Sequence, residues 1–272
     1  MSVNDISLTA GMRTNLLYLQ QTSSLLNRTQ QRLSSGKKVN SALDNPTNYF
    51  AAQNANQRAS DLSDRKDGLS EAVQTVNAAS AGISAITGLI AAAKGVAQSA
   101  LSTSDTNVQS KLAAQYNTIR TQIDNLSSDS GYRGLNLLSS INTLTVIFNE
   151  GGSSKLDVIG FLANSQGLSL ATASNNWQTS SDITTDTALM DTAISVLRTN
   201  TQTLAANLNI ITTRQSFTDA MTNTLLTGAD NLTLADMNEE GANMLMLQTR
   251  QSLGTTSLSM SSQAAQAVLR LF

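Results

Sequence analysis

The amino-acid sequence predicts a mainly α-helical protein, a long antiparallel helical bundle or coiled coil with a small central β-hairpin region. The 272-residue chain contains a single proline, Pro46, and because proline breaks helix interiors, its near absence permits very long helices. Aromatic residues make up only 4% of the chain, so the core must be built from Leu, Ile, Val, Ala and Met. Heptad spacing of apolar residues at both ends of the chain indicates coiled-coil packing.

The first predicted helix lies near the N-terminus and carries a heptad seam. Its members alternate in steps of four and three residues, the spacing of a coiled-coil interface. Two polar members weaken the seam, and an isolated helix of this kind is marginal in water, so we expect it to need a partner helix. The members are Met12, Leu16, Leu19, Ser23, Leu26, Gln30 and Leu33.

A much longer second helix is predicted after a connector. Gly36 suits a helix C-cap, and Asn45 followed by Pro46 suits an N-cap and a first helical position. The apolar stripe then recurs every seven residues, over far more than the length of a mean globular helix: Leu62, Leu69, Val76, Ile83, Ile90 and Ala97. Residues 102–107 indicate a turn, and a third helix follows with Val108, Leu112, Tyr116, Ile119, Ile123 and Leu126 on one face.

The middle of the chain changes to a β-rich composition. Residues 144–148 and 156–161 are rich in β-branched and aromatic side chains. The glycine-containing segment 149–154 separates them, so we expect a β-hairpin.

Residues 164–188 are rich in Ser and Thr and lack apolar periodicity. We therefore expect an exposed irregular loop around the only tryptophan, Trp177. Asp182 and Asp186 lie near the expected start of the next helix, where the helix dipole favours acids, and are interpreted as capping residues.

Heptads return in the last third of the chain, from Met190 to Thr218, and residues 228–231 indicate a break. The final predicted helix covers 234–272. Gln251 is the polar exception in its stripe, and the intervening Gly241, Gln248, Thr255 and Ser262 weaken it. Its apolar members are Met237, Met244, Leu258, Ala265 and Phe272, with Val268 and Leu271 adding apolar side chains near its end.

This pattern predicts five consecutive segments. Residues 1–45 form a terminal coiled-coil helix and connector, and 46–140 the N-terminal part of a helical shell domain. Residues 141–188 form the hairpin and exposed loop, 189–228 the C-terminal part of the shell domain, and 229–272 the second terminal coiled-coil helix.

Composition excludes several functions. Charged residues are 13% of the chain and the net charge is −2, which leaves no positive field for nucleic-acid binding. The absence of cysteine and histidine excludes disulfides, thiolate ligands, Ser–His–Asp triads and His-containing metal sites. No apolar run approaches eighteen residues and no secretory segment opens the chain, so we expect no membrane span and no cleaved signal peptide. We therefore expect no catalytic, cofactor-binding or metal site.

Three segments, in order, resemble the signatures of bacterial flagellins. Leu33–Asp44 (LSSGKKVNSALD) resembles the amino-terminal signature, and 129–138 (DSGYRGLNLL) the close of that region. Residues 233–272 are similar to the carboxy-terminal segment, through 237–243 (MNEEGAN) and 263–271 (QAAQAVLRL). Because few residues separate the conserved parts, the resemblance is to a short flagellin that lacks large outer domains.

The resemblance implies a structural subunit that polymerises with other copies or paralogues into the extracellular flagellar filament for motility. It implies export in an unfolded state through the flagellar export apparatus with an export chaperone, contacts with hook-associated and filament-cap proteins, and no cofactor. Assembly is expected to use the terminal seams: Met12, Leu16, Leu19, Leu26, Leu33, Met237, Met244, Leu258, Ala265, Val268, Leu271 and Phe272.

The resemblance also bears on recognition by the host Toll-like receptor that senses flagellin. Relatives that activate the receptor carry an arginine, a glutamate and a leucine just before a Gln-Ser-Ala motif. Here those positions are Ala91, Lys94 and Gly95. Because the arginine fork and the acid are both missing, we expect weak receptor recognition.

Two alternatives remain at this point. A hook–filament junction (hook-associated) protein of the same superfamily shares the terminal coiled-coil pattern. A coiled-coil interaction module inside the cell would explain the heptads but not the order of the three motifs. An enzyme is a distant third interpretation.

Overall fold

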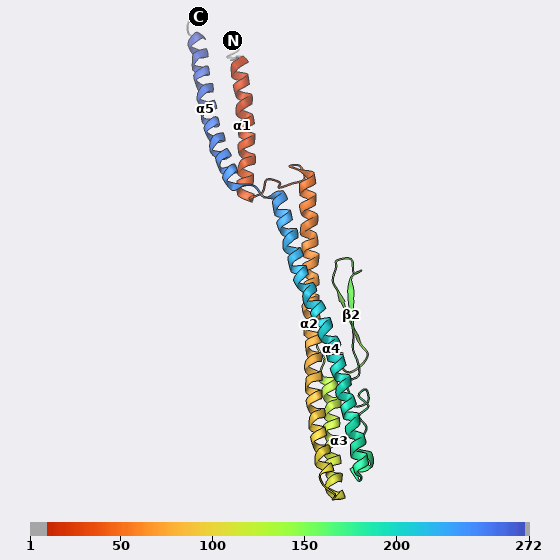
Figure 1. The fold of residues 1–272 in the computed structure, drawn as a ribbon. Helices are drawn as coiled ribbons and strands as arrows, with labels where there is room; N and C mark the ends of the chain where they lie inside the picture. The colour runs from red at the N-terminus through yellow and green to blue at the C-terminus, as the bar shows by residue number, and fades with distance from the viewer. Residues whose placement is uncertain (1–9, 270–272) are drawn as a thin grey trace. The chain divides into compact units, whose positions relative to one another are not determined.

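The computed structural model describes residues 10–269, and it confirms the mainly helical fold class, with a small two-stranded antiparallel sheet (Figure 1). The elements in chain order are α1 (Ala10–Ser35), α2 (Pro46–Leu101), α3 (Thr106–Asp129), β1 (Thr143–Ile147), β2 (Lys155–Ile159), a short 3-10 helix η1 (Ser174–Trp177), α4 (Ser180–Thr233) and α5 (Met237–Leu269).

The chain divides into two compact units. Unit 1 contains the two end regions, up to Gln57 and from Thr224 onward, and therefore holds α1 and α5. Unit 2 is the continuous segment Arg58–Asn223. Both boundaries fall within long helices, α2 and α4.

The core of unit 2 is built on the long stripe of α2. Every predicted member of that stripe is buried, and so is one column of the α4 heptads, whereas the other α4 column is half-buried or, at Thr201, exposed. The buried members are Leu62, Leu69, Val76, Ile83, Ile90, Ala97, Met190, Leu197, Leu204 and Ile211. Buried alanines such as Ala72, Ala79 and Ala93 keep the α2 surface flat, so neighbouring elements can approach closely. Gly82 on α2 has no room for a side chain, since a Cβ there would lie 2.7 Å from Leu138 Cδ1.

The predicted β-hairpin is confirmed. β1 and β2 pair antiparallel, with Leu144 opposite Val158 and Val146 opposite Leu156. Val146 and Val158 are buried in the core of unit 2, while the residues beside them in each strand are exposed or half-buried. The hairpin is therefore a cover over the helices and has one apolar face.

The expectation of an exposed loop over 164–188 is wrong. Trp177 is fully buried, and its ring stacks on Tyr116 of α3 with ring centroids 5.1 Å apart. The last part of the predicted loop is helical, since α4 begins at Ser180. Periodicity could not reveal this segment because its backbone is held by side chains of α3 and α4 rather than by its own regular structure.

Side chains of α3 bind the backbone of this segment at four places. The Tyr116 hydroxyl donates to Ala171 O at 2.9 Å and Arg120 Nε donates to Leu170 O at 2.8 Å. Asn117 accepts from Ala173 N at 3.0 Å, and Asp124 accepts from the backbone N of Ser165 at 2.6 Å and from its Oγ at 2.9 Å. These bonds satisfy backbone groups that have no strand or helix partner.

Asp186 has a different role from the one predicted. It is buried and accepts hydrogen bonds from Trp177 Nε1 at 2.6 Å, Ser174 N at 2.9 Å and Ser174 Oγ at 2.8 Å. Its carboxylate thus anchors the turn before α4 instead of capping the helix. Burial and the negative charge of Asp186 raise the pKa of Tyr116 to about 12.

Two helix boundaries also differ from the prediction. The break expected at 228–231 is absent, because α4 continues to Thr233, and α5 begins at Met237. Gly228 has open space around it, so nothing forces the chain to turn there. A single glycine inside a long helix costs only about 1 kcal/mol.

One window of eighteen residues in α2 is apolar enough to cross a membrane by length and composition. The sequence contains no uninterrupted apolar run of that length, and the window passes because small residues and few charges raise its mean hydropathy. The buried core helix of a protein that crosses no membrane can have the same length and composition.

Candidate functional site

The candidate site is the helix pair that α1 and α5 form within unit 1 (Figure 1). Asn15 Nδ2 donates to Ser257 Oγ at 3.0 Å, and Arg32 Nη1 lies 2.8 Å from Glu240 Oε1. Between them, Leu19 Cδ1 lies 3.0 Å from the position of a Cβ on Gly254. Partners late in α5 thus contact the start of α1, so the pair is antiparallel.

Each predicted seam consists of two columns, that is, two series of residues spaced seven apart. One column of each seam lies in the interface between α1 and α5. On α1, Met12 is buried, and Leu19, Leu26 and Leu33 are half-buried. On α5, the half-buried members are Met244, Gln251, Leu258 and Ala265. These members therefore have low exposure in the pair, and their use in assembly stays a prediction.

The second column is shared between the predicted positions and the residues one position before them. On α1, Asn15, Thr22 and Thr29 have low exposure and Ser23 is half-buried as well, while Leu16 is 36% exposed and Gln30 is exposed. On α5, Glu240 and Leu247 are buried, Gly241, Gly254, Ser261 and Ser262 are half-buried, and Gln248 and Thr255 are exposed. At Asn15 the shift has a polar cause, because its side chain donates to Ser257.

The remaining assembly residues lie away from this seam or cannot be placed. Met237 is in the first turn of α5 and is 47% exposed. The side chain of Val268, and Leu271 and Phe272 entirely, lie outside the described residues.

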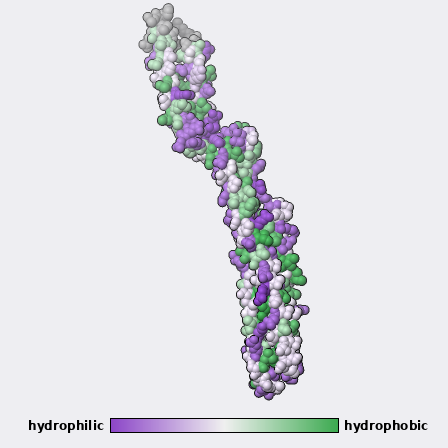
Figure 2. All heavy atoms as spheres, in the orientation of Figure 1, coloured by the Kyte–Doolittle hydropathy of each residue, from purple (hydrophilic) through white to green (hydrophobic). Residues whose placement is uncertain are grey.

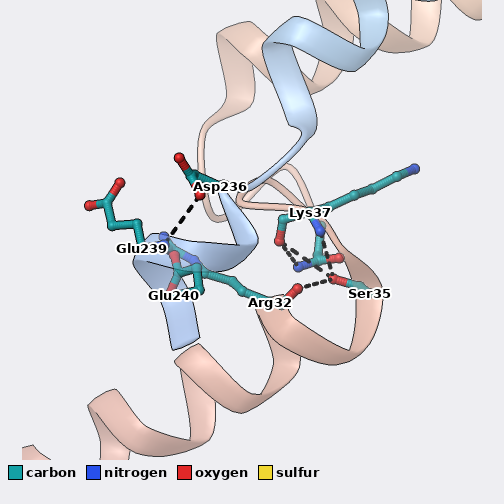
Figure 3. A network of polar contacts seen from close by, with 7 residues as sticks. Arg32, Ser35, Lys37, Asp236, Glu239 and Glu240 are labelled. Atoms are coloured by element: carbon teal, nitrogen blue, oxygen red, sulfur yellow. Dashed lines mark hydrogen bonds and ion pairs between the residues drawn. The ribbon is translucent and has the colours of Figure 1, made fainter. Parts of the chain in front are cut away.

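An ion pair joins the end of α1 to the start of α5 (Figure 3). Glu240 is buried, and its carboxylate pairs with the half-buried Arg32. Asp236 accepts from Asn238 N at 2.9 Å and Glu239 N at 3.2 Å, and so caps the start of α5. Because Glu240 is removed from water, loss of Arg32 leaves a buried charge without its partner.

The connector after α1 is fixed by backbone pairing with the segment before α5. Lys38 N donates to Thr233 O at 2.7 Å and Ala235 N donates to Gly36 O at 2.9 Å. Gly36 adopts a φ of 71°, a left-handed conformation that glycine adopts without steric cost. Periodicity gave no signal for this pairing; only the order Gly, then Asn-Pro, marked the segment as a connector.

A tight turn at the end of the connector turns one leucine outward. The Asp44 carboxylate accepts from Asn40 N and Ser41 N, both at 3.0 Å, and these bonds lower its pKa. Leu43, inside this turn, is 96% exposed.

Large apolar side chains also remain on the outer faces of the helix pair (Figure 2). Leu17 and Tyr18 are exposed on α1, and Leu245, Leu253 and Met260 are exposed on α5. Large apolar side chains left exposed in this number are candidates for contacts with a partner.

The three receptor-recognition positions belong to unit 2. Ala91 and Gly95 are exposed on α2. Lys94 forms an ion pair with Asp191 of α4, so its ammonium group is engaged within the chain.

Metal binding is not supported by residues 10–269, because they contain no cluster of three or more acidic, His or Cys side chains able to hold a metal ion. A hollow of about 310 Å³ near Arg32 and Glu240 is lined by four acids and two bases, and these include the ion pair and the helix cap already described. The site therefore has the properties of a structural interface.

A pair of helices whose seam is partly polar and whose outer faces carry exposed apolar side chains is typical of structural proteins of the coiled-coil class. The family model for the bacterial flagellin N-terminal helical region matches residues 6–143. Flagellin FljK of Caulobacter vibrioides is 30% identical over 281 residues that span all of both chains. The flagellin of Brucella melitensis is 29% identical over 270 residues, 95% of each chain. The crystal structure of Bacillus cereus flagellin aligns with a TM-score of 0.48 at 15% identity, over 56% of this chain and 88% of that one.

The chain belongs to the bacterial flagellin family. It is a structural subunit of the flagellar filament and not an enzyme. No observation favours the hook-associated alternative.

Proposed function

We propose that subunits polymerise through the α1–α5 pair, and that unit 2 forms the shell around the tube built by these pairs. The observation that supports this proposal is the combination of two surfaces on one helix pair. The inner seam is polar at Asn15, Thr29 and Gln251, so it contributes limited stability by itself. The outer faces carry leucines that no part of the described chain covers.

The apolar outer faces suit contacts between copies. In a helical polymer each copy uses two different surfaces, and the contact repeats without closing. The exposed leucines of α1 and α5 supply apolar surface for such contacts, and Leu43 adds a separate apolar side chain at the connector. Assembly through these faces would remove from water the side chains that a lone subunit leaves exposed.

The remaining partners follow from membership of the family. The proposed subunit leaves the cell unfolded through the flagellar export apparatus with an export chaperone. It meets hook-associated and cap proteins at the growing filament, and paralogues of the same family join it there. Its proposed location is outside the cell, with no nucleic-acid or membrane partner.

The experiment that tests this proposal exchanges the charges of Arg32 and Glu240. R32E and E240R each place like charges together in the helix pair, so each is expected to slow elongation of filament seeds strongly. The double variant R32E/E240R restores an ion pair and is expected to recover most of the elongation. Recovery is incomplete because an acid in the first turn of α5 contributes about 0.3–1 kcal/mol through the helix dipole.

Circular dichroism of each variant serves as the control, since unit 2 contains neither residue and must stay helical. Normal elongation by both single variants would refute a role for the helix pair in assembly.

A further inference from the structure

The sulfur atoms of this chain are concentrated on one helix. The sequence has eight methionines and no cysteine, and four of the methionines, Met237, Met244, Met246 and Met260, lie on α5. Met246 is 44% exposed and Met260 is 61% exposed, whereas Met190 in the core of unit 2 is fully buried. An oxidant in solution therefore reaches α5 methionines first.

Met246 and Met260 share a stripe on the outer side of α5. The stripe is apolar apart from two threonines, its members follow steps of three and four residues, and all of them are exposed: Ala242, Met246, Thr249, Leu253, Thr256, Met260 and Ala264. The opposite side of the helix carries the seam with α1, through Met244, Leu247 and Leu258. Thus α5 has two apolar faces, and α1 covers only one of them.

The occupant that fits the second stripe is another copy of this chain. Its heptad spacing is that of a helix packing surface, and the family to which the chain belongs polymerises into filaments. This step rests on the proposed function, because it assigns the stripe to contacts between subunits.

We propose that Met246 and Met260 form a peroxide-sensitive modification site that controls the addition of subunits to the filament. The thioether sulfur attacks one oxygen of hydrogen peroxide, an S–O bond forms and the O–O bond breaks. The departing hydroxide takes up the proton of the new S–OH group, which leaves methionine sulfoxide and water. The sulfur loses two electrons and the peroxide is reduced by the same two.

The product changes the stripe from apolar to polar. Methionine sulfoxide carries a strong hydrogen-bond acceptor, and it disrupts interfaces built from methionine. A free subunit exposes both sulfur atoms, whereas a subunit already in the filament has them covered by its neighbour. Oxidation therefore blocks new subunits and spares those in place.

The test compares seeded assembly of the full chain before and after mild hydrogen peroxide treatment, with peptide mass spectrometry to locate the sulfoxides. In free subunits, Met246 and Met260 are expected to oxidise well before Met190, and the critical concentration for elongation is expected to rise about tenfold, equivalent to about 1.4 kcal/mol per subunit. Treatment with methionine sulfoxide reductases is expected to restore assembly.

Two variants separate the stripe from other methionines. M246L/M260L keeps apolar side chains of similar volume and is expected to assemble both before and after peroxide. M237L removes an exposed methionine that lies off the stripe, so this variant is expected to remain sensitive to peroxide.

Each outcome decides a different claim. Sensitivity that persists in M246L/M260L, or oxidised subunits that elongate normally, overturns the modification site. Equal oxidation of Met260 in free subunits and in filaments removes the stripe from the subunit interface. Failure of the untreated chain to elongate seeds contradicts the proposed function itself.

Discussion

Replacing Asp186 with alanine is expected to destabilise unit 2 by about 2–4 kcal/mol. Hydrogen bonds to a charged group contribute about 1.5–3 kcal/mol each, and Asp186 accepts three of them. Two of the donors belong to Ser174, which is half-buried and can bind water in the variant. The third is the indole N–H of Trp177, which is buried and would lose its partner.

The backbone of the same turn makes the loss more severe. Asn175, Asn176 and Trp177 have φ values of 46°, 48° and 59°, a left-handed conformation that costs non-glycine residues about 1–2 kcal/mol each. The bonds to Asp186 hold the turn in this conformation. Without them the turn is expected to relax and to release Trp177 from its stack on Tyr116.

Because Trp177 is the only tryptophan, its fluorescence reports on this turn directly. Denaturant unfolding followed by fluorescence and circular dichroism should show a lower midpoint for D186A, and thermal unfolding a fall of roughly 4–16 °C. D191A is the matched control, since Asp191 lies on the same helix in an exposed ion pair that contributes about 0–1 kcal/mol. If D186A unfolds like D191A and its emission is unchanged, the anchoring role of Asp186 is refuted.

Three further predictions concern unit 2. Tyr116 has a folded pKa of about 12, above the unfolded value of about 10; its contribution to stability is therefore complete below pH 10 and is lost as pH rises toward 12, and Y116F should remove this part of the alkaline slope. G82A is expected to cost about 1–3 kcal/mol through overpacking, whereas G88A, with open space around it, should gain up to about 1 kcal/mol; equal effects in denaturant melts would contradict the close packing at Gly82. The chain is expected to be a poor activator of the Toll-like receptor for flagellin, because the anchors missing at Ala91, Lys94 and Gly95 typically contribute about 2 kcal/mol or more each; potency equal to that of a strongly stimulatory flagellin in reporter cells would contradict this.

Much of the fold could be predicted because its helices follow simple periodicity. The stripe from Leu62 to Ala97 is buried along its whole length, since each member lies seven residues after the last. The hairpin was predictable from composition, because two segments rich in β-branched and aromatic side chains flank a glycine-containing segment. Single-residue signals were less dependable: Gly228 suggested a break, yet the helix continues through it.

The parts that could not be predicted depend on side chains that bind distant backbone. The segment around Trp177 has no periodicity, and side chains of Asp186 and of four α3 residues bind its backbone. In the candidate site, the predicted column from Met12 to Leu33 has low exposure, and its use in assembly stays a prediction. In the other column, Asn15 and Thr29 have low exposure where an apolar pattern assigns the seam to Leu16 and Gln30.

The central claim is that the terminal helices serve polymerisation and not the folding of unit 2. Deleting residues 265–272 tests it most directly, with electron microscopy after seeded assembly and circular dichroism of the unassembled protein. The claim predicts that the truncated chain forms no filaments from seeds while the helical signal of unit 2 persists. Filaments of normal length and number from the truncated chain would contradict it.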